Sequence, residues 1–349
     1  MVEFAGVLAG PAVGMFFAEL GAEVVKIENK TTDGDMTRGW KLPSEDPASP
    51  VSAYFCSVNW GKRHLLLDLN DPADRDAALE HIRDADVVIS NFKPVSARKM
   101  GFDAATLRAR HPELIYARID AFADPEDERP AFDVVLQAEA GFLYMTGEPG
   151  RPPVKMPVAL IDLMAAHQLK EAILLALLRR TVTGEGAVVS VSLMESALAS
   201  LANQASNYLM TGHVPQRMGM QHPNIAPYGD IFTCADGKPV LLAVGTERQF
   251  RGLCEVLGMD WLPENPDFQT NTERVANRAA LNEFLAVAIS TKLSGELMPL
   301  LHKAGVPAAG IRDMRSVFEL PEAQAMVLEE TTGEGLTTKR VKTVAFKIE

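Results

Sequence analysis

The side chain with the clearest potential for chemistry is Asp162, a lone carboxylate that follows the apolar segment 157–161. A helical pattern runs over 163–180, so Asp162 stands where a helix N-cap is expected, and its oxygen can accept a hydrogen bond from a first-turn amide. A carboxylate there can also act as a nucleophile, because the helix dipole keeps it ionised and free amides stabilise an oxyanion. This stretch alone favours the structural cap over the nucleophile, so the choice between them depends on the rest of the chain.

Basic and amide side chains recur in loops that follow predicted strands. They lie in the segments 33–40, 59–63 and 91–94 and include Arg38 and Lys62. Each is most simply a solvated surface group. Their recurrence at one presumed sheet edge favours a polyphosphate site, because ligands bind at the carboxyl ends of strands in open α/β sheets. No Walker A sequence is present, which argues against ATP hydrolysis.

A glycine-containing turn imitates a dinucleotide-binding fingerprint. Gly10 and Gly14 follow a strand and precede a helix, and Glu28 closes the next strand. However, Ala12 replaces the second glycine of the fingerprint, and Pro11 stiffens the turn that should approach a pyrophosphate. The pattern therefore argues against NAD, although backbone amides of such a turn can still meet a ligand.

Composition and charge exclude several classes of protein. The chain has 349 residues, is 47% hydrophobic and carries a formal charge of −12, which argues against a nucleic-acid binder. Three widely spaced cysteines form no metal or redox motif, so we expect a reducing cytoplasm. The most apolar helix, 169–178, is too short to span a bilayer, and no membrane association is expected. The histidines have no metal-ligand spacing, and no metal site is predicted.

The order of elements predicts an α/β fold. Strand-like segments occur at 2–4, 23–27, 64–68, 86–90, 114–119 and 187–192. Helical patterns occur between them at 13–20, 72–83, 104–110 and 134–144, which indicates a parallel sheet with helices on its faces. A capping box at Ser192 and Glu195 opens a further helix that we expect to run to about residue 209.

The character of the chain changes near Gly212. Two strands, 229–233 and 239–244, and helices near 249–257, 277–289 and 295–304 predict a smaller α+β domain. We expect a large domain over 1–212, a small domain over 213–318, and a segment over 319–349 that returns to the large domain through a turn at 331–335 and a strand at 341–346. The abrupt first strand and final strand indicate that terminal segments are missing.

These motifs, in this order, resemble the class III CoA-transferase family, which includes formyl-CoA transferases and carnitine CoA-transferases. The resemblance covers essentially the whole chain, and its most specific segments are 7–11, 20–28, 34–38, 91–94, 132–137 and 183–186. It implies a Rossmann-like large domain with a parallel sheet, a smaller α+β domain and an interlocked homodimer.

The resemblance also implies a covalent mechanism at Asp162. The carboxylate would attack an acyl-CoA thioester, giving first a mixed anhydride and then an enzyme-bound CoA thioester. The residues implied to line the CoA site or to approach its reacting end are Val7, Leu8, Ala9, Arg38, Lys62, Leu67, Asn91, Phe92, Lys99 and Asp133. Coenzyme A thioester is then a substrate, a carboxylic acid is the acceptor, and no tightly bound cofactor is expected.

Some residues depart from patterns within the superfamily. The glycine run that formyl-CoA transferases use is absent, and the loop 218–222 stands in its place. In the related 2-methylacyl-CoA racemases a histidine precedes the aspartate that matches Asp133, and Phe132 at this position cannot relay a proton. The stretch 217–228 is more similar to members that pass CoA between dicarboxylic acids, often from succinyl-CoA.

Arg217 and His222 lie in this loop and are candidates to recognise a substrate carboxylate, although the loop alone fits an interdomain linker equally well. The prediction is therefore a CoA-transferase with Asp162 as nucleophile. The alternatives are a 2-methylacyl-CoA racemase or epimerase, a nucleotide-binding dehydrogenase, and a non-catalytic CoA-binding protein in which Asp162 is only a cap.

Overall fold

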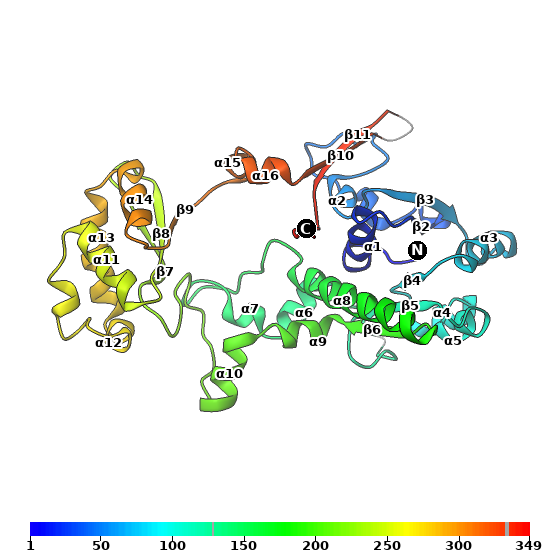
Figure 1. The fold of residues 1–349 in the computed structure, drawn as a ribbon, viewed down its shortest axis with the longest axis horizontal. Coiled ribbons are helices and arrows are strands. Elements are labelled where there is room, and N and C mark those ends of the chain that lie inside the picture. Colours follow the sequence, from blue (N-terminus) through cyan, green and yellow to red (C-terminus); the bar gives the residue numbers. More distant parts are fainter. Residues whose placement is uncertain (128, 332–334) are drawn as a thin grey trace. The chain divides into compact units, whose positions relative to one another are not determined.

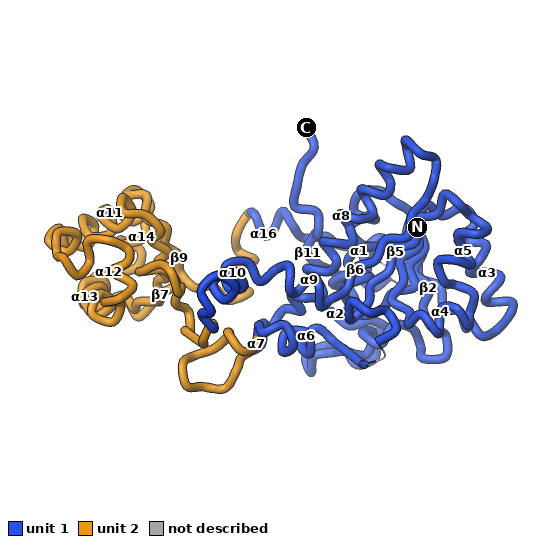
Figure 2. Tube along the Cα trace, turned by 90° about the horizontal axis from the view of Figure 1, so that it is seen from below, with its two compact units in different colours: residues 1–142, 155–214, 322–349 blue, residues 143–154, 215–321 orange. Residues whose placement is uncertain are grey.

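The computed structural model describes residues 1–127, 129–331 and 335–349. The chain separates into two compact units (Figure 2). Unit 1 contains residues 1–142, 155–214 and 322–349, and unit 2 contains residues 143–154 and 215–321. The segment 143–154 falls within the range expected for the large domain but belongs to unit 2, so each unit is assembled from separate stretches of the chain.

A six-stranded parallel sheet forms the centre of unit 1 (Figure 1). Its strands, in spatial order, are β3 (Lys62–Leu67), β2 (Val24–Asn29), β1 (Val2–Glu3), β4 (Val87–Ser90), β5 (Ile115–Asp120) and β6 (Val188–Ser192). All six predicted strands are present, and every neighbouring pair is parallel. The strand order reverses direction between β1 and β4, and at such a point the loops leaving two strands diverge and open a crevice.

Both faces of this sheet are covered by helices. One face packs against α1 (Ala9–Glu19), α8 (Leu160–Thr183) and α9 (Leu193–Ala199), and the other against α3 (Pro72–Arg83) and α5 (Ala104–Arg110). Side chains of β4 alternate between the two cores, with Val87 and Ile89 in the first and Val88 in the second. Such double burial explains why the strands read as continuous apolar runs.

The remaining helices of unit 1 are short, and most of them border the sheet's connections. They are α2 (Ala53–Cys56), α4 (Pro94–Met100), α6 (Asp133–Glu139), α7 (Phe142–Met145, which reaches into unit 2), α10 (Ala202–Thr211) and α16 (Pro321–Ala325, which begins in unit 2). Ser192 caps α9 as predicted, since its hydroxyl accepts a hydrogen bond from the Glu195 amide at 3.1 Å. The predicted continuous helix is wrong, because it breaks before α10 where Ala202 has a φ of 49°.

The helix that carries Asp162 begins earlier than predicted. α8 starts at Leu160 with Ala159 as its N-cap, so Asp162 is the third helical residue. The predicted N-cap role of Asp162 is therefore wrong. The carboxylate that accepts hydrogen bonds from the first-turn amides is Asp133.

Two glycines of α1 allow this helix to lie directly against the sheet. A Cβ on Gly10 would lie 2.2 Å from Cβ of Ala5, and a Cβ on Gly14 would lie 1.8 Å from Oε2 of Glu3. Both distances are far below contact distance, so these positions require glycine for close helix–strand packing. The fingerprint-like spacing thus has a packing explanation.

Unit 2 contains a three-stranded antiparallel sheet covered by helices. Its strands are β7 (Tyr228–Thr233), β8 (Pro239–Ala243) and β9 (Ala308–Gly310), and its helices are α11 (Glu247–Leu257), α12 (Asn271–Ala276), α13 (Arg278–Ser290), α14 (Ser294–Lys303) and α15 (Met314–Val317). The first two strands and three of the helices were predicted. β9 was not, because its three residues, Ala-Ala-Gly, have no strand preference of their own.

The last residues form a hairpin and a tail in unit 1. β10 (Val327–Thr331) pairs with β11 (Thr337–Val341), and the amide of Gly61 donates to Oε1 of Glu330 at 3.2 Å. The predicted strand at 341–346 is wrong, since β11 ends at Val341, and most of the predicted turn at 331–335 lies outside the described residues. The tail is instead held by Glu19, which accepts from the Thr343 amide at 2.8 Å.

No single helix in the described parts of the chain is long and apolar enough to cross a membrane. α13 and α14 together have the length and composition, but the pair is bent by 119°.

Gly14→Ala is expected to lower the free energy of unfolding by about 3 kcal/mol, because overpacking against the buried Glu3 carboxylate must displace α1. Gly295→Ala is the matched control, since a Cβ there meets no atom within 4 Å. Urea unfolding of both variants measures the difference. Equal stability of the two variants would contradict this account of the helix–strand packing.

Candidate active site

Asp162 lies in a pocket at the carboxyl end of the parallel sheet. The pocket is built from the loops that follow β1, β4 and β5 and from the start of α8. Residues that line it include Val7, Leu8, Ala9, Asn91, Phe92, Asp120, Phe132 and Asp162. It thus brings together Asp162 with five of the residues predicted to contact CoA, at the reversal point of the strand order.

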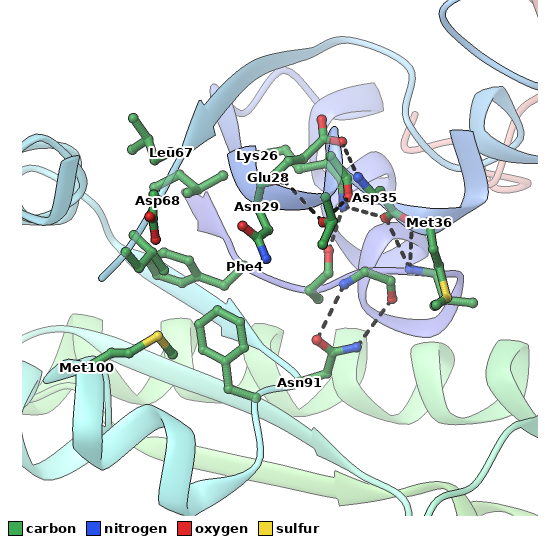
Figure 3. A pocket seen from close by; sticks show the side chains of 18 of the residues that line it. Phe4, Lys26, Glu28, Asn29, Asp35, Met36, Leu67, Asp68, Asn91 and Met100 are labelled. Atoms are coloured by element: carbon green, nitrogen blue, oxygen red, sulfur yellow. Dashed lines mark hydrogen bonds and ion pairs between the residues drawn. The ribbon is translucent and has the colours of Figure 1, made fainter. Parts of the chain in front are cut away.

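A second pocket adjoins the first along the same sheet edge (Figure 3). It lies at the ends of β1, β2 and β3, and its lining includes Leu67, Asn29 and Asp68. Gly6, Val7, Asn91 and Phe92 line both pockets. The two pockets therefore share a wall made by the β1–α1 turn and the end of β4, and the shared residues place Leu67 along the same edge as Asp162.

Asp133 provides the cap of the helix that carries Asp162. Its Oδ1 accepts hydrogen bonds from the amides of Ile161 at 2.6 Å and Asp162 at 3.3 Å. Its Oδ2 accepts from Nε2 of Gln137 at 2.5 Å, and Oε1 of Gln137 in turn accepts from the Met156 amide at 3.1 Å. Because Asp133 takes up these first-turn amides from outside, α8 can begin before Asp162, and the Asp162 carboxylate is left free of capping.

The Asp162 side chain is buried and lies beside a second carboxylate. Its residue is 8% exposed, and no described residue donates a hydrogen bond to its carboxylate. Burial, and then the charge of Asp133, raise the pKa of Asp162 to about 7. Desolvation and like-charge repulsion therefore oppose the helix dipole, which was expected to keep this group ionised, and the carboxyl is partly protonated near neutral pH.

Arg38 is bound to Glu28 next to the shared wall. Its Nε and Nη2 each lie 2.7 Å from an oxygen of Glu28, and its guanidinium lies 3.9 Å from the centre of the Phe55 ring. Burial alone would raise the pKa of Glu28, but the hydrogen bonds from Arg38 and His64 hold this pKa well below its usual range. This pair holds Arg38 beside Glu28, which lines the second pocket, while Arg38 itself lines neither pocket.

Lys62 and Lys99 lie outside both pockets. Lys62 is buried, and its Nζ lies 2.8 Å from Glu3 and 3.0 Å from Asn59 Oδ1. Burial lowers the pKa of Lys62 to about 8 although Glu3 opposes this shift. Lys99 is exposed on α4 and lines neither pocket. The geometry gives Lys62 a structural contact rather than access to a ligand within unit 1.

Arg217 and His222 belong to unit 2. Arg217 Nη1 donates to the Tyr144 carbonyl at 3.0 Å, and its guanidinium lies 5.7 Å from the centre of the Tyr144 ring. His222 Nδ1 accepts from the Asn224 amide at 3.1 Å and its ring packs edge-on against Tyr228. These contacts fix the Arg217 and His222 side chains against neighbouring residues of unit 2.

Two residues that support the site were not identified from the sequence. Gln137 orients Asp133, and Asp35 bonds to the β1–α1 turn at the shared wall. Each lies inside a segment that carried the family resemblance, 132–137 and 34–38, which was the available signal. Within the described residues, no group of three or more His, Cys, Asp or Glu side chains is arranged to hold a metal ion.

Comparison with known proteins places the chain in a family. A family model described as CoA-transferase family III matches residues 1–349. The chain is 36% identical over 330 residues to the succinate–glutarate CoA-transferase of Agrobacterium fabrum, covering 93% of this chain and 82% of that protein. It is 31% identical over 324 residues to the succinyl-CoA:glutarate CoA-transferase of Homo sapiens, covering 92% and 73%.

A solved structure agrees with this placement. The crystal structure of a CAIB/BAIF family protein from Brucella suis matches with a TM-score of 0.83 and 37% identity, covering 99% of this chain and 90% of that one. The chain therefore belongs to CoA-transferase family III, a family of transferases, and its α/β fold with a six-stranded parallel sheet is the fold of that structure. The predicted family is confirmed.

Asp162→Asn is expected to stabilise the protein at pH 8 relative to wild type, with the difference vanishing near pH 4. The folded carboxyl holds its proton up to about pH 7, whereas in the unfolded chain it ionises near its ordinary pKa of about 4. As the pH rises from 4 to 7, the free energy of unfolding of the wild type therefore decreases. The asparagine variant, which has no carboxyl at this position, does not show this decrease. Urea unfolding of both proteins across pH 4–8 measures it, and a constant difference would contradict the raised pKa.

Asp133→Asn is expected to lower the pKa of Asp162 below that in wild type while leaving it above its ordinary value. The amide oxygen can still accept from the Ile161 amide, but the repelling charge is gone, and burial, the larger cause, remains. Carboxyl-carbon NMR titration of Asp162 measures the shift. Asp133→Ala is the companion variant, expected to cost about 1 kcal/mol of stability through the lost cap.

Proposed function

We propose that this protein transfers CoA from an acyl-CoA donor to a carboxylic acid acceptor, with Asp162 as the covalent nucleophile. The observation that carries this proposal is the position of the Asp162 carboxylate. It is buried, receives no hydrogen bond from the described residues, and lies in a pocket at the reversal point of the sheet. Asp133 keeps the helix capped without it, so Asp162 is free for chemistry.

The proposed reaction keeps the thioester's free energy in covalent intermediates. The ionised Asp162 oxygen attacks the thioester carbonyl, the C–S bond breaks, and the CoA thiolate leaves a mixed anhydride. The thiolate then attacks the aspartyl carbonyl, releasing the donor's carboxylate and forming an aspartyl-CoA thioester. The acceptor carboxylate attacks this thioester, and the same two exchanges in reverse give the new acyl-CoA and regenerate Asp162. Protons balance throughout, and burial excludes the water that would hydrolyse either intermediate.

The pocket walls supply the proposed CoA contacts. Val7, Leu8, Ala9, Asn91 and Phe92 line the pocket of Asp162, and Leu67 lines the adjoining pocket. We assign Arg38, Lys62 and Asp133 to the support of these walls, since each is engaged by a neighbouring residue. Lys99, exposed on α4 beside the second pocket's Met100, is available to a flexible part of the ligand.

We further propose a dicarboxylic acid acceptor with succinyl-CoA as donor. Support comes from the relatives above, whose names specify succinate, succinyl-CoA and glutarate. Arg217 and His222 would recognise the second carboxylate, because a guanidinium and an imidazole on the same loop of unit 2 can both donate hydrogen bonds to a carboxylate. The family resemblance supports an interlocked homodimer as the assembled form of the protein.

A racemase is the less favourable reading. α-Proton exchange needs a base and a conjugate acid at the reacting carbon. Phe132, which lines the pocket beside Asp162, offers neither. Substrate that gains no deuterium at its α-carbon during incubation in deuterated water would agree with CoA transfer rather than racemisation.

Incubation with succinyl-CoA followed by hydroxylamine is expected to modify Asp162, because an anhydride or thioester at its carbonyl is cleaved to a hydroxamate. Intact-mass and peptide mass spectrometry locate the product. Asp162→Ala should give none, while Asp120→Asn, which alters another carboxylate of the same pocket, should retain it. Modification that persists in Asp162→Ala, or is absent from the wild type with a panel of acyl-CoA donors, would overturn the assignment.

A further inference from the structure

The wall shared by the two pockets contains a strained residue. Among the described residues, three that are not glycine have a positive φ, and Val7, at 72°, is the one with a β-branched side chain. Such a conformation is unfavourable for valine, because its Cβ substituents crowd the backbone. Strain of this kind persists only where surrounding contacts impose it. Val7 lines both pockets, so something next to the site holds it there.

Asp35 is the group that holds Val7. The Val7 amide donates to Oδ2 of Asp35 at 3.1 Å and lies 3.4 Å from Oδ1. The Asp35 side chain is only 2% exposed, so this bond is shielded from water. Figure 3 shows the Asp35 side chain directed toward the β1–α1 turn from the neighbouring loop.

Asp35 is itself fixed on two sides. Lys26 Nζ lies 3.2 Å from its Oδ2, and both are almost fully buried. The Thr37 amide and hydroxyl donate to Oδ1 at 3.0 and 2.8 Å. A buried carboxylate with a cation and two donors has one orientation, and it can therefore impose a conformation on the amide that it meets.

The peptides before Val7 are held by other groups. Lys26 Nζ donates to the Ala5 carbonyl at 2.5 Å. Asn91 brackets Gly6, accepting from its amide and donating to its carbonyl, both at 3.3 Å. Among the described residues, Asp35 is the one that accepts a hydrogen bond from the Val7 amide, and the left-handed turn there directs the chain into Leu8 and Ala9, which line the pocket of Asp162.

We propose that Asp35, supported by Lys26, is a positioning residue for CoA transfer: it holds Val7 in the left-handed conformation that places Leu8 and Ala9 against the Asp162 pocket. This inference rests on the proposed function and adds a residue that lines the second pocket and acts on the Asp162 pocket only through Val7. Without the Asp35 carboxylate, Val7 relaxes toward negative φ, and the peptide that follows it turns away from its place in the wall.

Asp35→Ala is expected to slow hydroxylamine-detected acylation of Asp162 by about 100-fold, the effect of a small misplacement at a reacting centre. The dissociation constant for CoA, measured by calorimetry, should change far less. The decisive variant is Asp35→Ala combined with Val7→Gly. Glycine adopts positive φ without a Cβ penalty, so the double variant should recover most of the lost rate relative to Val7→Gly alone.

Ile82→Ala is the matched stability control. Ile82 is fully buried in the core on the face of the sheet that faces α3, away from both pockets. This variant should lose stability yet acylate Asp162 at the wild-type rate. Two outcomes would overturn the positioning role. In the first, Val7→Gly does not relieve the rate loss of Asp35→Ala. In the second, Ile82→Ala shows the same rate loss at equal stability.

Two outcomes need a further variant or readout. If Asp35→Ala does not fold, Asp35→Asn keeps the shape and one acceptor oxygen but loses the charge that Lys26 binds, and its smaller rate loss should be relieved by Val7→Gly in the same way. If the wild type forms no adduct, the proposed function fails first. A crystal structure of the Asp35 variant then tests the role of Asp35 directly. A negative φ at Val7 in that structure supports the inference, and an unchanged positive φ overturns it.

Discussion

The architecture of unit 1 depends on a group of charges buried beneath the carboxyl end of β1. Glu3 lies between Lys26 and Lys62, at 3.0 and 2.8 Å, and Lys26 also reaches Asp35. Two carboxylates and two ammonium groups balance in charge, which makes their removal from water tolerable as long as all four remain. Lys62 also donates to the Pro11 carbonyl in α1, so one cluster ties three strands and a helix together. The β1–α1 turn can be strained because its base is anchored in this way.

A second electrostatic arrangement surrounds Asp162, the proposed nucleophile. Two carboxylates meet at the start of α8, and they divide the available hydrogen bonds unequally. Asp133 accepts hydrogen bonds from the first-turn amides and from Gln137, whereas the Asp162 carboxylate accepts none from the described residues, and burial followed by the charge of Asp133 raises its pKa to about 7. A less solvated carboxylate is a stronger nucleophile once ionised, and a pKa near neutrality leaves a usable fraction ionised. One aspartate thereby caps the helix, and the other is left available for the proposed reaction.

Much of the fold was predictable because its signals are local. The strands of unit 1 are short apolar runs, and the helices between them follow capping residues and a helical period. The errors came from contacts between distant residues. The start of α8 depends on Asp133, 29 positions upstream of Asp162, and Lys62 read as a surface cation because its partner Glu3 comes from another strand. Asp35 was hidden for the same reason, since the amide that it meets lies in a different turn.

The interleaved boundaries of the two units have a consequence for biosynthesis. Residues 322–349 of unit 1 follow the whole of unit 2 in the chain, and residues 143–154 of unit 2 precede residues 155–214 of unit 1. On a ribosome, the central sheet can form once β6 has emerged, but its hairpin and the tail bound by Glu19 arrive only after unit 2 has been made. Folding in the usual amino-to-carboxyl order is thus replaced by a nested one, in which the inserted unit is completed before the unit that encloses it.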